Sequence, residues 1–249
     1  MNAFKLKSSS VPLLAVVFCA AVARAQFPDK FTNLQVLPKD ISRADLQSTM
    51  RGFAFALGVR CNHCHVEKTE GKQVQLDFAA DDKETKKTAR VMLQMVATIN
   101  RDYIGKLSTQ PPIRVQCVTC HHGLTQPRTL NSVLADAIDQ KGIDGATALY
   151  RELRQKYYGS GQYDFGETSL NQLCESLLAQ KKNKEALAIM ELNFDSNHPD
   201  SLWSYHMLAQ AHLANGLTEK AVADYRKVVE LHPDDDWAKE QIQSLSNRK

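Results

Sequence analysis

The sequence is short of chain-breaking residues and has no dominant charge. Its 249 residues include 11 glycines and 8 prolines, while 43% are hydrophobic. This composition is typical of a globular and largely helical protein, because glycine and proline interrupt helices. The formal net charge of +3 comes from the first 25 residues, which hold basic side chains and no acidic ones. The charge balance therefore gives no reason to expect nucleic-acid binding.

A long hydrophobic run is missing as well. The apolar segment Val11–Val22 is too short to span a bilayer as a helix. It follows Lys5 and Lys7 and precedes the small-residue pattern Ala23–Ala25, an order typical of an export signal cleaved after residue 25. An uncleaved N-terminal anchor is the alternative interpretation. We therefore expect a periplasmic protein, and leave open its peripheral association with the cytoplasmic membrane.

Against this background the cysteines stand out by their arrangement. The pattern Cys-x-x-Cys-His occurs twice, as Cys61, Cys64 and His65 and again as Cys117, Cys120 and His121. In such a motif the two thiols attach haem c covalently, and the histidine binds the iron. Two copies predict two covalently bound haem c groups, with both histidines as axial ligands.

Other uses of paired cysteines fit less well. A zinc ribbon also uses two Cys-x-x-Cys units, but its units usually lie about 15–20 residues apart, closer than Cys64 and Cys117. A thioredoxin-like redox pair follows a strand of a βαβ unit, a pattern that surrounds neither motif. Structural disulfides suit an exported protein but leave the two histidines unexplained.

The segment before the first motif has the signals of a helix. Ser42 can cap its start with Asp45 as partner, and Gly58 stands where a left-handed residue would end it. The helix would carry one apolar face, made of Leu46, Met50, Phe53 and Leu57. Haem is a natural surface for that face to pack against. Met50 would then either bind iron opposite His65 or simply pack.

A second helix precedes the second motif. Asp81 or Asp82 is expected to cap it, and it should run to about Ile104. Its apolar face includes Met92, with Met95 flanking that face. A basic cluster occupies the first turns: Lys83, Lys86, Lys87 and Arg90. We interpret the cluster as a solvated face, with docking of an acidic redox partner as the alternative. Between the helices, residues 66–80 are expected to form a loop or small hairpin.

Residues 27–128 resemble half of the cytochrome subunit of photosynthetic reaction centres. That family places a methionine on a helix before each of its first three haem motifs, and Met50 is similarly placed. The family subunit carries four haems, whereas this sequence has two motifs. The resemblance implies an electron carrier, with Met50 as an axial iron ligand.

The second motif carries the same resemblance. Met95 followed five residues later by Asn100 is similar to the family's second helix. The ending Cys117–Gly123, with a basic residue and glycine after the motif, is similar to its second haem site. The resemblance thus implies Met95 as the axial ligand of the second iron, with Met92 as the alternative.

The last half of the chain reads as a helical repeat. Residues 203–233 match a tetratricopeptide unit that turns at Gly216, and Trp237 would begin a capping helix. The preceding unit is recognised by its constant offset. Leu173, Ala186 and Met190 stand one repeat before Leu208, Ala221 and Tyr225, in that order. A degenerate earlier pair is expected to turn at Gly142. Cys174 should be a buried, inert thiol. The scattered histidines read as surface or groove residues: His198, His206, His212 and His232.

These patterns predict an all-α protein, with a signal peptide (1–25), a dihaem cytochrome c domain (26–130) and a tetratricopeptide-repeat array (131–249). We expect it to carry single electrons to a redox protein, membrane-bound or not, while the repeats hold a peptide or protein in their groove. Two alternatives stay open. One is a dihaem peroxidase-like enzyme, for which we find no catalytic acid or base; the other is a repeat scaffold with accessory haems.

Overall fold

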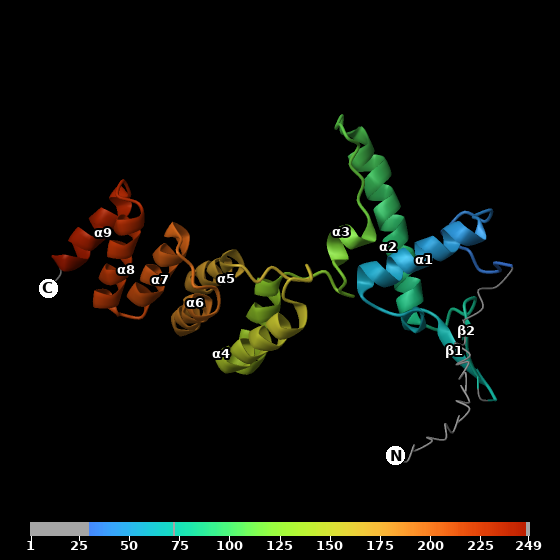
Figure 1. Cartoon of the computed structure of the whole chain (residues 1–249), viewed down its shortest axis with the longest axis horizontal. Coiled ribbons are helices and arrows are strands. Elements are labelled where there is room, and N and C mark those ends of the chain that lie inside the picture. Colours follow the sequence, from blue (N-terminus) through green and yellow to red (C-terminus); the bar gives the residue numbers. More distant parts are fainter. Residues whose placement is uncertain (1–29, 72, 248–249) are drawn as a thin grey trace, which may run out of the picture.

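The computed structural model describes residues 30–71 and 73–247, so the expected signal peptide lies outside the described residues. The described chain is largely helical, as predicted (Figure 1). None of its helices combines the length and apolarity that crossing a membrane would require. The chain divides visibly into a region that carries the two motifs and a stack of paired helices.

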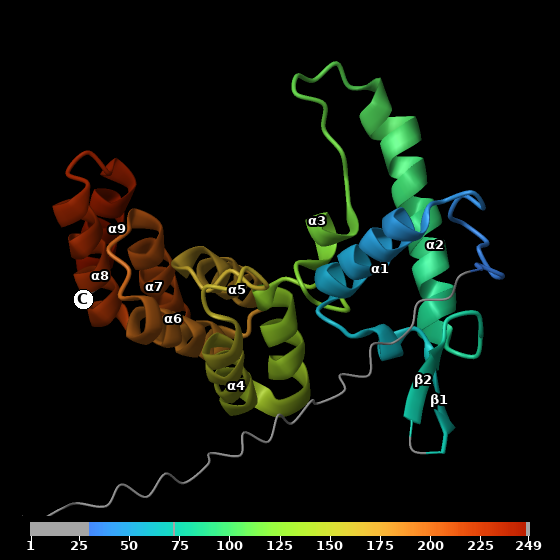
Figure 2. The same ribbon diagram turned by 45° about the vertical axis from the view of Figure 1, so that its right-hand side comes forward.

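The motif region contains two long helices, a hairpin and short helical turns. Its elements are α1 (Arg43–Leu57), the 3-10 turn η1 (Cys61–His63), β1 (Val66–Glu70), β2 (Gln73–Asp77), α2 (Glu84–Thr98), the π-helical turn η2 (Ile99–Tyr103), the 3-10 turn η3 (Ile104–Lys106) and α3 (Cys117–His121). The strands form an antiparallel two-stranded sheet in which Val66 pairs with Asp77. In Figure 2, α1 crosses α2, and α3 lies beside α1.

Helix α1 begins and ends as its sequence predicts. The Ser42 hydroxyl accepts a hydrogen bond from the Asp45 backbone N–H at 3.1 Å, which caps the first turn. Gly58 ends the helix in the left-handed conformation, with φ of 64°. The start of α2 differs from the prediction, because Lys83 occupies the capping position and neither Asp81 nor Asp82 does. Asp81 instead binds Lys86 and Arg90 at 3.0 and 2.8 Å.

The helical stack follows the predicted repeat. Its helices are α4 (Leu130–Tyr157), α5 (Glu167–Ala179), α6 (Asn183–Asn197), α7 (Leu202–Ala214), α8 (Thr218–Leu231) and α9 (Asp236–Ser246). Gly142 (φ 70°, ψ −177°) breaks α4 into two helices, as expected for the degenerate first pair. Helix α9 begins beside Trp237 and ends the stack.

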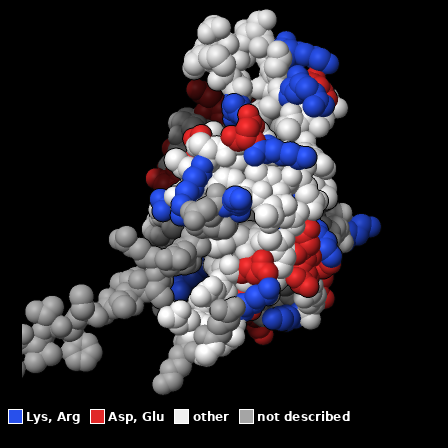
Figure 3. Space-filling model, turned by 90° about the vertical axis from the view of Figure 1, so that its right-hand side faces the viewer, with Lys and Arg blue, Asp and Glu red and all other residues white. Residues whose placement is uncertain are grey.

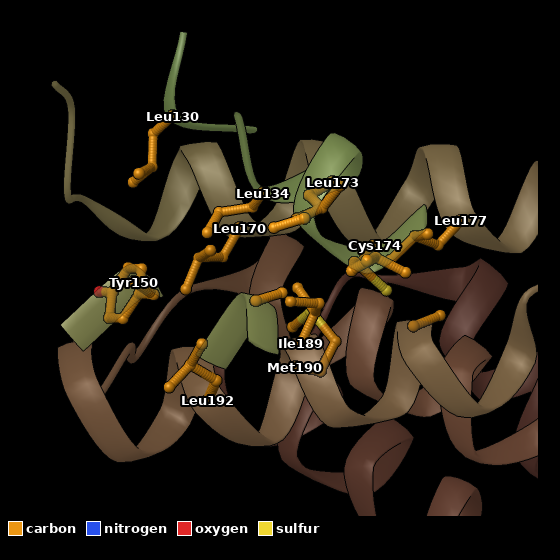
Figure 4. Packing of buried hydrophobic residues seen from close by; sticks show 14 of the residues in the cluster. Leu130, Leu134, Tyr150, Leu170, Leu173, Cys174, Leu177, Ile189, Met190 and Leu192 are labelled. Atoms are coloured by element: carbon orange, nitrogen blue, oxygen red, sulfur yellow. The ribbon is translucent and has the colours of Figure 1, made fainter. Parts of the chain in front are cut away.

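The hydrophobic core belongs almost wholly to this stack. Side chains from α4, α5 and α6 point toward one another in Figure 4, and Tyr150, Leu170 and Met190 are fully buried there. Cys174 is also fully buried, and burial raises the pKa of its thiol to about 12, which confirms the prediction of an inert residue. His212 was expected at the surface or in the groove and is 7% exposed, and its Nδ1 pairs with the Asp224 carboxylate at 2.6 Å.

Candidate functional site: two haem motifs on one cavity

A cavity of about 1020 Å³ lies among α1, α2, the hairpin and α3, and its wall is mostly apolar. The predicted apolar face of α1 lines it completely: Leu46, Met50, Phe53 and Leu57. From α2 come Ala89, Met92 and Leu93. The amphipathic pattern of α1 therefore faces a space large enough for a flat apolar ligand.

Both motifs reach this cavity. The first contributes Cys61, Cys64 and His65, and the second contributes Cys117 and His121. Cys120 lines a neighbouring cavity of about 480 Å³, which His121 also borders and which extends to residues 161–172 of the helical stack. The fold therefore brings together residues that lie far apart in the sequence.

The second motif holds its histidine by a backbone hydrogen bond. His121 is 8% exposed, and its Nδ1 lies 2.8 Å from the Leu124 carbonyl oxygen, to which it donates. In the neutral ring this bond places the proton on Nδ1, and Nε2 is then the nitrogen with a lone pair. Metal-binding histidines use this arrangement, because the outer hydrogen bond orients the ring and raises its basicity.

The first motif holds its histidine differently. Nδ1 of His65 is buried and has no hydrogen-bond partner in the part of the chain that the structure describes. The Phe78 ring packs edge-on at 5.0 Å between centroids. Burial, and next the charge of Lys86, lower the pKa of His65, with partial opposition from the Phe78 backbone. The neutral imidazole is thereby favoured, and that is the form that binds a metal.

The thiols of the two motifs are free and are not arranged for zinc. The structure joins none of the described cysteines in a disulfide. Within residues 30–71 and 73–247, no three His, Cys, Asp or Glu side chains converge as a metal site would require. Burial is the main cause that raises the pKa of Cys64 and of Cys117, so both thiols are protonated at neutral pH.

The three candidate methionines lie in different surroundings. Met50 and Met92 line the large cavity. Met95 is 42% exposed and lies outside that lining. Met92 therefore lies on the wall of the cavity that residues of both motifs line, whereas Met95 lies on an exposed part of α2. The identity of each axial methionine remains a prediction.

Lys83, Lys86 and Arg90 of the basic cluster bond to other segments of the motif region, while Lys87 stays exposed. Lys86 is 8% exposed, and its Nζ donates to the carbonyls of Phe78, Ala79 and Ala80 at 2.7–3.1 Å. Lys83 donates to the Asn62 carbonyl, and Thr85 donates to that of His63 at 2.6 Å. Lys87 pairs with Glu84.

The outer surface of this end of the molecule agrees with that finding. Figure 3 shows positive and negative groups interspersed over the face in view, with no broad field of one sign. Lys83, Lys86 and Arg90 are engaged within the chain, and docking of an acidic partner on this cluster stays a prediction.

The second motif is fastened by an amide and by two glycines. The Asn100 side chain donates to the Val115 carbonyl at 2.8 Å and accepts from the Val115 N–H at 2.8 Å. The Gly123 N–H donates to the Ala56 carbonyl at 2.8 Å. A Cβ on Gly58 would lie 2.1 Å from the Gly123 carbonyl oxygen. The end of α1 therefore meets the end of the second motif at a backbone contact that only glycine permits.

Sequence reasoning placed Lys86 on a solvated face and missed two arginines of the cavity wall. Arg51 and Arg60 line the cavity and are exposed. Their charge suits the carboxylates of a bound cofactor. No local pattern distinguishes them from ordinary surface residues. The only hint in the sequence that Lys86 has a special role is the unusually basic start of the predicted helix to which it belongs.

The donor set fits haem c. Each motif offers two free thiols and one imidazole, the cavity offers an apolar wall, and methionine sulfur lies on that wall. In proteins, c-type haem is attached covalently through cysteine sulfur, and its iron is bound by histidine imidazole and methionine thioether.

Comparisons with known proteins agree with this geometry. The model of the family described as "Photosynthetic reaction centre cytochrome C subunit" matches residues 8–185, more than half of the chain. A tetratricopeptide-repeat model matches residues 167–234. Cytochrome c-554 of Chloroflexus aurantiacus is 35% identical over 98 residues, which are 39% of this chain and 21% of that protein.

A second relative is similar over the same extent. The photosynthetic reaction center cytochrome c subunit of Thermochromatium tepidum is 31% identical over 100 residues, which are 39% of this chain and 22% of that protein. The chain thus spans about a fifth of the length of these curated relatives.

Solved structures that are similar are tetratricopeptide domains. The first such domain of human RPAP3 has a TM-score of 0.33 at 19% identity, over 47% of this chain and 87% of that one. The Arabidopsis OM64 domain has a TM-score of 0.34 at 18% identity, over 48% of this chain and 93% of that one.

Proposed function

Because the chain belongs to the family of photosynthetic reaction centre cytochrome c subunits, we propose that it is a dihaem c-type cytochrome that carries single electrons in the periplasm. Its repeats dock it to a redox partner, which is soluble or membrane-bound. The observation that carries this proposal is the single apolar cavity onto which both Cys-x-x-Cys-His motifs open.

Each part of the cavity wall has a role in this function. Cys61, Cys64, Cys117 and Cys120 would hold two haems covalently. His65 and His121 would bind the irons, together with Met50 at the first and Met95 or Met92 at the second. When bound, each haem would supply a one-electron iron couple.

The remaining residues would tune and protect that couple. The apolar side chains of α1 and α2 line the cavity, where they would exclude water from the bound cofactor. Exclusion of water and thioether ligation both raise a haem's reduction potential. Arg51 and Arg60 lie on the wall, where they can pair with the cofactor's carboxylates.

Counting haems in matched motif variants tests the proposal. The chain is matured in a bacterial periplasm as wild type, as Cys61→Ala/Cys64→Ala and as Cys117→Ala/Cys120→Ala. We expect haem per chain to fall by half in each variant, with low-spin iron in what remains. Zinc in place of iron, or unchanged haem content in either variant, would overturn the proposal.

The methionines are tested by the same spectra. Loss of thioether ligation removes the methionine–iron charge-transfer band and lowers the reduction potential of the affected haem. We expect this result for Met50→Ala, and for one of Met95→Ala and Met92→Ala. The other variant of that pair is the internal control.

A further inference from the structure

The chain has two tryptophans, and both occupy the same place in successive repeat units. Trp203 and Trp237 each end the pattern Pro-Asp-x-x-Trp, at residues 199–203 and 233–237. Each is the second residue of its helix, α7 and α9 respectively. The repeat therefore places two large aromatic rings in register.

Equivalent caps fix the two helix starts. The Ser201 side chain accepts from the Ser204 N–H at 3.2 Å, and the Asp235 carboxylate accepts from the Ala238 N–H at 2.8 Å. A capped first turn holds the backbone of the following tryptophan in one orientation.

His206 links the two tryptophans, because it lies one turn after Trp203 on α7 and its ring contacts that of Trp237. His206 follows Trp203 by three residues on α7, so the two side chains are neighbours on that helix. The Trp237 ring lies 5.0 Å from the His206 ring. We name this group of three residues, Trp203, His206 and Trp237, the tryptophan surface.

The tryptophan surface is exposed although its rings are apolar. Trp203 is 37% exposed and Trp237 is 45% exposed. Large aromatic rings left in water at adjacent positions mark an interaction site more often than isolated ones do.

The border of the tryptophan surface is acidic. Asp200 and Asp234 stand at equivalent positions before the two tryptophans and are exposed, as is Glu240. The Asp236 side chain is 84% exposed. Within residues 233–240 the single basic side chain, Lys239, pairs with Asp236 at 2.9 Å.

We propose that the tryptophan surface binds an extended cationic segment of a partner protein, with arginine or lysine side chains packed on the indole rings. Indole faces attract cations, and the bordering carboxylates add attraction for a positive chain and repulsion for a negative one. This inference deepens the proposed docking role of the repeats and rests on it.

The test is isothermal titration of the full, haem-loaded chain with two synthetic peptides at low salt. One alternates arginine with glycine over nine residues, and the other has glutamate in place of every arginine. We expect binding of the arginine peptide alone, with affinity that falls as salt is added. Trp203→Ala/Trp237→Ala should weaken it by at least about tenfold, and Asp234→Asn/Asp236→Asn by less.

Controls separate loss of the surface from loss of the fold. Tyr158→Ala removes another aromatic ring, 66% exposed but outside the repeats' helix starts, and should leave binding unchanged. Trp203→Phe/Trp237→Phe keeps aromatic faces and should retain part of the affinity. Thermal unfolding of each variant reports whether the repeats still fold.

Three results would overturn the inference: equal binding of both peptides, unchanged binding after removal of both tryptophans, or preferential binding of the glutamate peptide. The last of these would leave a docking role for the repeats. Failure of haem loading in the motif experiment would instead refute the proposed electron carrier and leave the peptide result standing.

Discussion

The two regions of this molecule differ in how they bury hydrophobic side chains. From Leu130 onward, the helical stack packs two clusters of buried hydrophobic side chains, a large one centred on α4–α6 and a smaller one on α7–α9. Among the described residues before Leu130, the buried hydrophobic side chains are Leu46 and Ala56. The motif region instead directs its apolar faces toward the cavity that both motifs share. The apolar residues of a region can thus be arranged to pack against a bound group instead of against other side chains of the chain.

The contrast bears on stability. Two fully buried hydrophobic side chains are a small core for the described residues before Leu130. The stack, by contrast, has a core of its own. The motif region should therefore depend on haem for its fold, and the stack should not.

The largest expected effect comes from removing every attachment point. In Cys61→Ala/Cys64→Ala/Cys117→Ala/Cys120→Ala we expect α1, α2 and α3 to lose protection against hydrogen exchange, because their apolar faces would have no haem to pack against. Helices α4–α9 should keep theirs. Exchange followed by mass spectrometry measures both regions in one sample. Equal protection of α1 and α2 in the variant and the wild type would contradict the expectation that the motif region depends on haem for its fold.

A smaller effect is expected at the contact between the ends of α1 and the second motif. Gly58→Ala should destabilise the motif region by about 3 kcal/mol, because the new methyl group meets the Gly123 carbonyl and the residue has a positive φ. Gly52→Ala is the matched control, since it lies on the same helix with no atom within 4 Å of its Cβ. It should stabilise α1 by about 0.5–1 kcal/mol. Chemical denaturation followed by circular dichroism measures both changes.

The smallest effect concerns the first motif alone. Lys86→Met should cost about 2 kcal/mol, because three backbone carbonyls would lose their shared donor. Lys87→Met, on the same turn, removes an exposed pair with Glu84 and should change stability by less than about 0.5 kcal/mol. Denaturation followed at the first haem's absorption measures both variants. Equal effects of the two substitutions would show that Lys86 has no special role.

Much of the local structure could be predicted because its causes are local. Ser42 and Gly58 bound α1 as expected, and Gly142 turns the first helix pair. The repeat offset correctly placed the last two pairs and the capping helix. The errors concern side chains whose environment is made by distant segments. Lys86 is buried by the end of the hairpin, and His212 by Asp224 on the next helix.

The sequence by itself determined the two haem motifs, the apolar face of α1 and the repeat period, because each depends on spacing along one segment. Only the tertiary structure decided that both motifs open on one cavity, that Gly58 meets Gly123, and that Met92 rather than Met95 lines that cavity. Those features depend on how α1, α2 and α3 approach one another. The approach of packed segments is set by contacts between residues far apart in the chain, and no short pattern encodes it.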